Sequence, residues 1–108
     1  MTPQELIARA EDLIDAYNHR DVDRIVAAFS PDVHLGDASS GRGRDAVRTD
    51  AERRFADDPE QRFELVRTLA FGNVVVQEWT DRGTAGVTVA DYDPSGRIAA
   101  LARYGSVR

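Results

Sequence analysis

The chain has 108 residues with 42% hydrophobic and 31% charged residues, which is typical of one globular domain. It has no cysteine, and its 14 basic residues are all arginine, so thiol nucleophiles, thiolate metal sites and Schiff-base catalysis are excluded. A formal net charge of −5 argues against a nucleic-acid partner. The sequence shows neither a long apolar run nor a signal-peptide pattern. We therefore expect a cytoplasmic protein with no membrane partner.

The N-terminal third predicts two helices. Thr2-Pro3-Gln4-Glu5 is a capping box with proline at the first helical position. Apolar residues follow at helical spacing and predict a helix over residues 3–18. Asp21 is placed to cap a second, short helix whose buried side includes Phe29, and Ser30-Pro31-Asp32 is expected to end it.

A short strand, a loop and a third helix are expected next. Residues 33–36 read as the strand and 38–43, rich in small residues, as the loop. The third helix is predicted over about 44–57. Asp50 and Arg54 fall inside its apolar arc one turn apart, so we expect them to pair at the rim of the pocket.

The second half predicts four strands joined by turns. Segment 61–71 alternates, with one phase formed by Phe63, Leu65, Leu69 and Phe71. Segment 74–80 is continuously β-branched, as in a strand buried on both faces, and segments 84–92 and 98–104 follow hairpin signals. Helices followed by a meander predict an α+β fold in which three N-terminal helices pack on a curved antiparallel sheet.

Several short motifs carry a resemblance to a known superfamily. They are Asn18-His19-Arg20-Asp21-Val22-Asp23, Phe29-Ser30-Pro31-Asp32-Val33, Gly43-Arg44-Asp45-Ala46-Val47, Asp93-Pro94-Ser95-Gly96-Arg97-Ile98 and a late Tyr104. Their order and spacing resemble the nuclear transport factor two-like superfamily, which holds ketosteroid isomerases, SnoaL-type polyketide cyclases and limonene epoxide hydrolases. The resemblance covers nearly the whole chain, 1–108.

The resemblance implies a cystatin-like α+β roll, a cone with an internal pocket between sheet and helices. It also implies a homodimer through the outer sheet face. It does not imply one activity, because this fold hosts both enzymes and binding modules. By position, the known isomerase donors are replaced by Leu13 and Thr88, so steroid isomerisation by that constellation is not expected.

Asp37 is the candidate catalytic residue. It shares a strand face with Val33 and Leu35, and it falls where the isomerases that this chain resembles carry their proton-shuttling aspartate. A carboxylate facing an apolar cavity is a plausible general base for a carbon acid or for water. The alternative is an aspartate that caps a turn through its own backbone.

Five further residues are candidates for substrate binding. Tyr17 is a possible donor from the first helix, or a core residue. Thr88 is a second possible donor. Gln77 and Trp79 share the strand face that the family turns to its pocket, although Trp79 could instead pack in the core or a dimer interface. Arg103 is in the strand phase that the family turns inward. If it is buried there, it needs Asp37, Glu78 or a substrate carboxylate as its partner. The alternative is that Arg103 lies in solvent at the edge of the sheet.

No metal and no cofactor are expected. His19 and His34 are the two histidines and lie on different elements. The sequence leaves three functions open. The first is an isomerase, cyclase or hydrolase acting on a small apolar molecule, within a cavity of at least about 300 Å³. The second is a non-catalytic ligand-binding or accessory domain, and the third is a structural dimerisation module.

Overall fold

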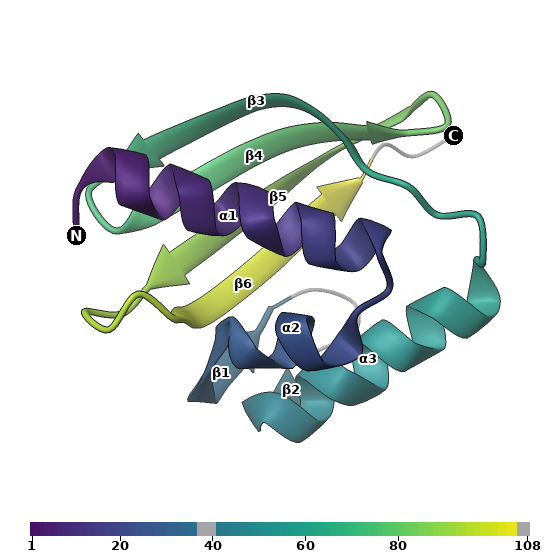
Figure 1. The fold of residues 1–108 in the computed structure, drawn as a ribbon, viewed down its shortest axis with the longest axis horizontal. Coiled ribbons are helices and arrows are strands. Elements are labelled where there is room, and N and C mark those ends of the chain that lie inside the picture. The colour runs from purple at the N-terminus through teal and green to yellow at the C-terminus, as the bar shows by residue number, and fades with distance from the viewer. Residues whose placement is uncertain (37–40, 106–108) are drawn as a thin grey trace.

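The computed structural model describes residues 1–36 and 41–105 (Figure 1). In chain order its elements are α1 (Pro3–Asn18), α2 (Val22–Ala27), β1 (Phe29–Leu35), β2 (Gly41–Arg42), α3 (Gly43–Asp57), β3 (Glu64–Phe71), β4 (Val74–Asp81), β5 (Thr84–Tyr92) and β6 (Ile98–Gly105). No helix in these two described segments is long and apolar enough to cross a membrane.

Helix α1 begins and ends where the sequence predicted. The Thr2 hydroxyl accepts the Glu5 N–H at 3.1 Å, and the Glu5 carboxylate accepts the Thr2 N–H at 2.9 Å, which completes the capping box. The apolar stripe of the helix is buried against the sheet; its members are Leu6, Ala10, Leu13, Ile14 and Tyr17. Burying one leucine side chain contributes about 1.5–3 kcal/mol, so this stripe is a large part of the core.

The segment after α2 differs from the prediction. Asp21 caps α2 as expected, by accepting the Arg24 N–H at 3.2 Å. The helix ends at Ala27, however, and Phe29 already begins β1, four residues before the predicted strand. Pairing explains the change: Phe29 lies opposite Ile98 of β6, and both side chains are buried. The pairing with Ile98 therefore places Phe29 in the sheet and not in the predicted helix. The short strand β2 likewise begins inside the predicted loop.

The sheet is mixed rather than wholly antiparallel, which corrects that part of the prediction. Its strand order is β2-β1-β6-β5-β4-β3, and β1 runs parallel to β6. Hairpin signals in the sequence fix the directions of β3 to β6, because a tight turn forces antiparallel pairing. No such turn joins β1 to β6, since α3 and four strands lie between them in the chain. Local sequence therefore gave no information about that pair.

The helices cover one face of the sheet (Figure 1). Helix α1 packs on β3 and β4, whereas α3 packs on β1 and on α2. The face opposite the helices is not covered by any described element, so β4 is buried on one face only, contrary to expectation. Val75, Gln77 and Trp79 are buried, whereas Val76 and Glu78 are half-exposed.

Bulges shift the side-chain phase of two strands. The register of β3 against β4 slips between Leu65 and Arg67, so Leu69 and Phe71 lie on the exposed face, out of phase with Phe63. An inserted residue reverses the faces of everything that follows it, which a strict alternation rule misses. A similar slip at the start of β6 leaves Leu101 and Arg103 on the face that meets the helices.

Candidate functional site

A row of polar side chains crosses the face of the sheet that the helices cover. In the strand register, Thr68 pairs with Gln77, Gln77 with Thr88, and Thr88 with Arg103. Directly opposite residues of paired strands lie side by side on one face, so these four form a continuous line over β3, β4, β5 and β6. Gln77 and Thr88 are buried, at 3% and 6% exposure. The row thus lies within the apolar interior.

Arg103 joins this row to two helices. Its Nη2 donates to the Tyr17 hydroxyl oxygen at 2.6 Å, and its guanidinium carbon lies 4.9 Å from the centre of the Tyr17 ring. Its Nη1 lies 3.5 Å from Asp50 Oδ2. The Arg103 side chain is 10% exposed, so the alternative of a solvent position at the sheet edge is wrong. Of the partners expected for it, Glu78 instead binds Arg67 on the other face of the sheet.

Asp50 is the charged partner that the sequence analysis did not assign to Arg103. Its Oδ2 accepts from Arg54 Nε at 2.9 Å, as the helical spacing predicted, and its Oδ1 accepts from Arg53 at 3.1 Å. Asp50 is only 4% exposed, so these ion pairs are largely shielded from solvent on the side of the carboxylate. A carboxylate inside the apolar arc of α3 was the available signal, because a buried charge requires partners.

Tyr17 is both a core residue and a polar group of the site. Its ring meets Phe55 and Phe63 edge-on, at centroid distances of 6.2 and 5.9 Å. Its oxygen accepts the Arg103 hydrogen bond, which leaves the phenolic hydrogen for a further acceptor. The two sequence interpretations of Tyr17 are therefore compatible.

Trp79 continues the aromatic cluster. Its ring lies edge-on to Phe63 at 4.7 Å, and its Nε1 donates to the Thr88 hydroxyl at 2.9 Å. The indole also covers Gly86, where any Cβ would collide with the ring. Trp79 is thus held rigidly on the inner face, in the core. Tyr17, Phe55, Phe63 and Trp79 thus pack against one another between the helices and the sheet.

Gln77 carries an unpaired donor. Among the residues that the structure describes, no acceptor meets its buried side-chain Nε2. A buried donor without a partner costs about 1–3 kcal/mol, and such a group calls for an explanation such as a water or a ligand.

Asp37 lies outside the described residues, so its expected place on a cavity wall stays a prediction. The chain is well defined up to the residue before it. Val33 and Leu35 are buried and His34 is exposed, as the predicted alternation requires. The Gly36 N–H then donates to the Leu101 oxygen at 2.9 Å, two residues from Arg103 on β6.

Neither histidine belongs to a metal site in the described part of the chain. No group of three or more histidine or acidic side chains there is arranged to hold a metal ion. His19 contacts Asp15 of its own helix, and His34 accepts from Arg42 Nε at 3.2 Å. The clustered residues are instead Tyr17, Asp50, Gln77, Trp79, Thr88 and Arg103.

Comparison with known proteins places this arrangement in a family. The family model described as the SnoaL-like domain matches residues 10–106, which is most of the chain. The chain belongs to the SnoaL-like domain family. No match was found among curated protein sequences. The polar row and the aromatic cluster are thus features of a SnoaL-like domain, within the superfamily that the sequence motifs resemble.

Solved structures show the same fold at low sequence identity. A SnoaL-like protein of unknown function from Burkholderia thailandensis has a TM-score of 0.91 and 19% identity, with 99% of each chain covered. An NTF-2 like protein of unknown function from Burkholderia xenovorans has a TM-score of 0.79 and 17% identity, covering 97% of this chain and 85% of that one. An LEH-like epoxide hydrolase of M. tuberculosis has a TM-score of 0.76 and 24% identity, with coverages of 96% and 84%.

Proposed function

We propose that this SnoaL-like domain binds a small, largely apolar molecule between α1, α3 and the inner face of the sheet. We further propose that it is an enzyme of the isomerase, cyclase or hydrolase range with Asp37 as general base. The observation that carries the proposal is the pairing of Arg103 with Tyr17 inside an apolar interior, in line with the unpaired Gln77 amide.

The two donors define which molecule would fit. The Tyr17 hydrogen and the Gln77 Nε2–H both lack a described acceptor, and both come from residues that are almost fully buried. A carbonyl, epoxide or enolate oxygen would satisfy them, whereas a wholly apolar molecule would not. Phe63 and Trp79 offer the apolar wall for the remainder of that molecule.

The proposed chemistry follows from these positions. Asp37 would take a proton from the carbon adjacent to the bound carbonyl group, which leaves an enolate oxygen at the two donors, or from a water molecule that attacks the carbonyl or epoxide carbon. The hydrogen bond from Arg103 polarises the Tyr17 hydroxyl, which strengthens the donor toward an oxygen that gains negative charge. Loss of one such donor typically lowers kcat by about 10²–10³. Asp50 is a positioning residue that holds Arg103, and no cofactor is required.

Asp37→Asn tests the catalytic half of the proposal, with exposed Asp32→Asn as the matched control. Candidate compounds would come from a thermal-shift screen of small ketones, lactones and epoxides, because a bound ligand raises Tm by mass action. For any compound turned over, Asp37→Asn should lower kcat at least about 100-fold while Kd stays within about threefold. Equal turnover in Asp37→Asn and Asp32→Asn would remove Asp37 from the mechanism.

A second candidate function is a non-catalytic ligand-binding or accessory domain that dimerises. The outer face of the sheet favours it, because Val66, Phe71 and Tyr104 are each more than 60% exposed there. A hollow of about 400 Å³ lies on this face and includes Val87 in its lining. Contiguous apolar surface of this kind typically marks a partner site, and the proposed partner is a second copy of the chain.

The dimer is tested by measuring the molar mass of the protein with light scattering. The protein concentration should be about 10–100 µM, which is on the order of the Kd of a moderately stable dimer. The wild type should have twice the monomer mass, and Tyr104→Glu should be monomeric. Arg97→Glu, exposed in the β5–β6 turn, is the control. A monomeric wild type would reject the dimer without affecting the proposal for the interior.

A further inference from the structure

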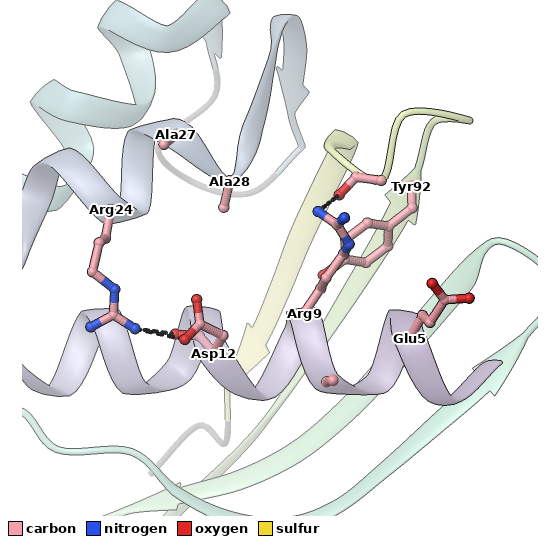
Figure 2. A pocket seen from close by; sticks show the side chains of 9 residues that line it. Glu5, Arg9, Asp12, Arg24, Ala27, Ala28 and Tyr92 are labelled. Carbon is pink, nitrogen blue, oxygen red and sulfur yellow. Dashed lines mark hydrogen bonds and ion pairs between the residues drawn. The ribbon is translucent and has the colours of Figure 1, made fainter. Parts of the chain in front are cut away.

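A second hollow, of about 590 Å³, lies between α1, α2 and the β5–β6 turn. Figure 2 shows its lining, which includes one stripe of α1 formed by Glu5, Ala8, Arg9 and Asp12. Such i, i+3, i+4, i+7 spacing brings these residues to one face of the helix. The other side is lined by Arg24, Ala27, Ala28, Tyr92 and Gly96. Three alanines among these residues leave room for a bound molecule.

Arg9 is held in a fixed position in this hollow. Its Nη1 donates to the Gly96 carbonyl oxygen at 3.2 Å (Figure 2). Gly96 has φ +83°, and a Cβ there would come within 2.8 Å of Arg9 Cζ and 2.6 Å of Met1 Sδ. Only glycine therefore lets the guanidinium approach this closely. Among residues 1–36 and 41–105, the hydrogen-bond acceptor found for the Arg9 side chain is the Gly96 carbonyl oxygen. Most of the five guanidinium N–H donors are therefore available to a ligand.

Tyr92 contributes a buried hydroxyl without a partner. The residue is 4% exposed, and its hydroxyl oxygen meets no hydrogen-bond partner among the described residues. Burial raises the pKa of Tyr92 to about 12, so the group keeps its proton at neutral pH and can donate it. In Figure 2 the Tyr92 ring lies directly behind the Arg9 side chain. Arg9 and Tyr92, from distant parts of the chain, thus both line the hollow.

The lining of the hollow carries four charged groups, which are the carboxylates of Glu5 and Asp12 and the guanidinium groups of Arg9 and Arg24. The Glu5 carboxylate accepts the Thr2 N–H, and the Asp12 carboxylate binds Arg24 at 2.7 Å, so both acids are engaged. Arg9, in contrast, contacts a neutral carbonyl group. The nearby carboxylates of Glu5 and Asp12 repel any anion, and they repel a dianion such as phosphate about twice as strongly as a monoanion.

We propose that this hollow is a binding site for a small organic monocarboxylate. Its carboxylate would pair with the Arg9 guanidinium and accept the Tyr92 hydrogen, since arginine suits planar, bidentate recognition of a carboxylate. The apolar body would lie against Ala8, Ala27 and Ala28. The site is separate from the polar row, so it stands whether or not the interior is catalytic.

An NMR titration of the full chain with sodium benzoate tests the site, and neutral benzamide is the matched probe. Benzoate should shift the backbone amide signals of Ala27, Ala28 and Gly96, with benzamide at least about tenfold weaker. Arg9→Gln should weaken benzoate binding about tenfold or more, and Tyr92→Phe several-fold. Arg97→Gln, an exposed arginine of the same turn, should bind as the wild type does.

Three results would overturn the proposal. These are an absence of benzoate shifts at the hollow, equal binding of benzoate and benzamide, and equal benzoate affinity in Arg9→Gln and Arg97→Gln. If Arg9→Gln does not fold, Tyr92→Phe and the comparison of the two probes still decide the question.

Discussion

Arg103, on the last strand, donates a 2.6 Å hydrogen bond to the hydroxyl of Tyr17, on the first helix, across a sequence separation of 86 residues. The arginine also lies over the ring of that tyrosine, so the contact combines a charge-assisted hydrogen bond with a cation–π interaction. It ties the two ends of the chain together inside the domain. The contact therefore has a structural role, and the phenolic hydrogen of Tyr17 is what the proposed function uses.

Replacement of Tyr17 by phenylalanine tests the structural part of this contact. The variant keeps the ring against Phe55 and Phe63 but removes the oxygen that accepts from Arg103. The free energy of unfolding, measured in urea, should fall by about 1–3 kcal/mol. Tyr104→Phe, at an exposed position, should change it by less than about 0.5 kcal/mol. Equal stability of the two variants would mean that the Arg103 contact contributes nothing.

Asp50→Asn should destabilise the domain far more than an exposed aspartate does. Asp50 is buried in ion pairs with Arg54 and Arg103, and removing one member of a buried ion pair costs about 3–5 kcal/mol. Asp23→Asn is the control, because Asp23 pairs with Arg48 at the surface and such pairs contribute about 0–1 kcal/mol. Chemical denaturation compares them. A loss below about 1 kcal/mol in Asp50→Asn would show that the buried pairing is not required for stability.

Gln77→Met should stabilise the protein and weaken ligand binding at the same time. Methionine has a similar volume and removes the unpaired Nε2, so stability should be unchanged or about 1 kcal/mol higher. A ligand that accepts from this amide should bind the variant at least about tenfold more weakly. Thermal unfolding without and with ligand measures both quantities. A clear loss of stability without ligand would show that the Gln77 amide has a structural partner.

The raised pKa of Tyr92 predicts that the folded protein loses stability at alkaline pH. That pKa is raised from 10 to about 12 by burial, so between these values the unfolded chain releases a proton that the folded chain keeps. Stability should therefore fall as pH rises from about 10 to 12, by on the order of 2 kcal/mol in total. The lack of lysine simplifies the experiment, because no lysine titrates in this range. Tyr92→Phe should remove this contribution, and an unchanged profile in that variant would contradict it.

The sequence was most informative where local rules decide the structure. The Thr2 capping box and the Asp21 cap placed α1 and the start of α2 correctly, and the hairpin turns gave the order and direction of the last four strands. It was uninformative where distant segments meet. The parallel pairing of β1 with β6 and the early start of the strand at Phe29 both depend on residues near Ile98.

The candidate site was predictable in part for the same reason. Strand alternation placed Gln77 and Trp79 on one face, where the structure has them. The pairing of Arg103 with Asp50 was missed because Asp50 lies on another element and had a local partner in Arg54. The bulge in β3 reversed the phase of Leu69, since no residue type in that strand signals an insertion.

A parallel thermal-shift screen of the wild type and Gln77→Met with small ketones, lactones and epoxides tests the ligand site most directly. We expect some of these compounds to raise the Tm of the wild type by several degrees and to have little effect on Gln77→Met. If every compound leaves the wild type unchanged, or shifts both proteins equally, the polar row is not a ligand site.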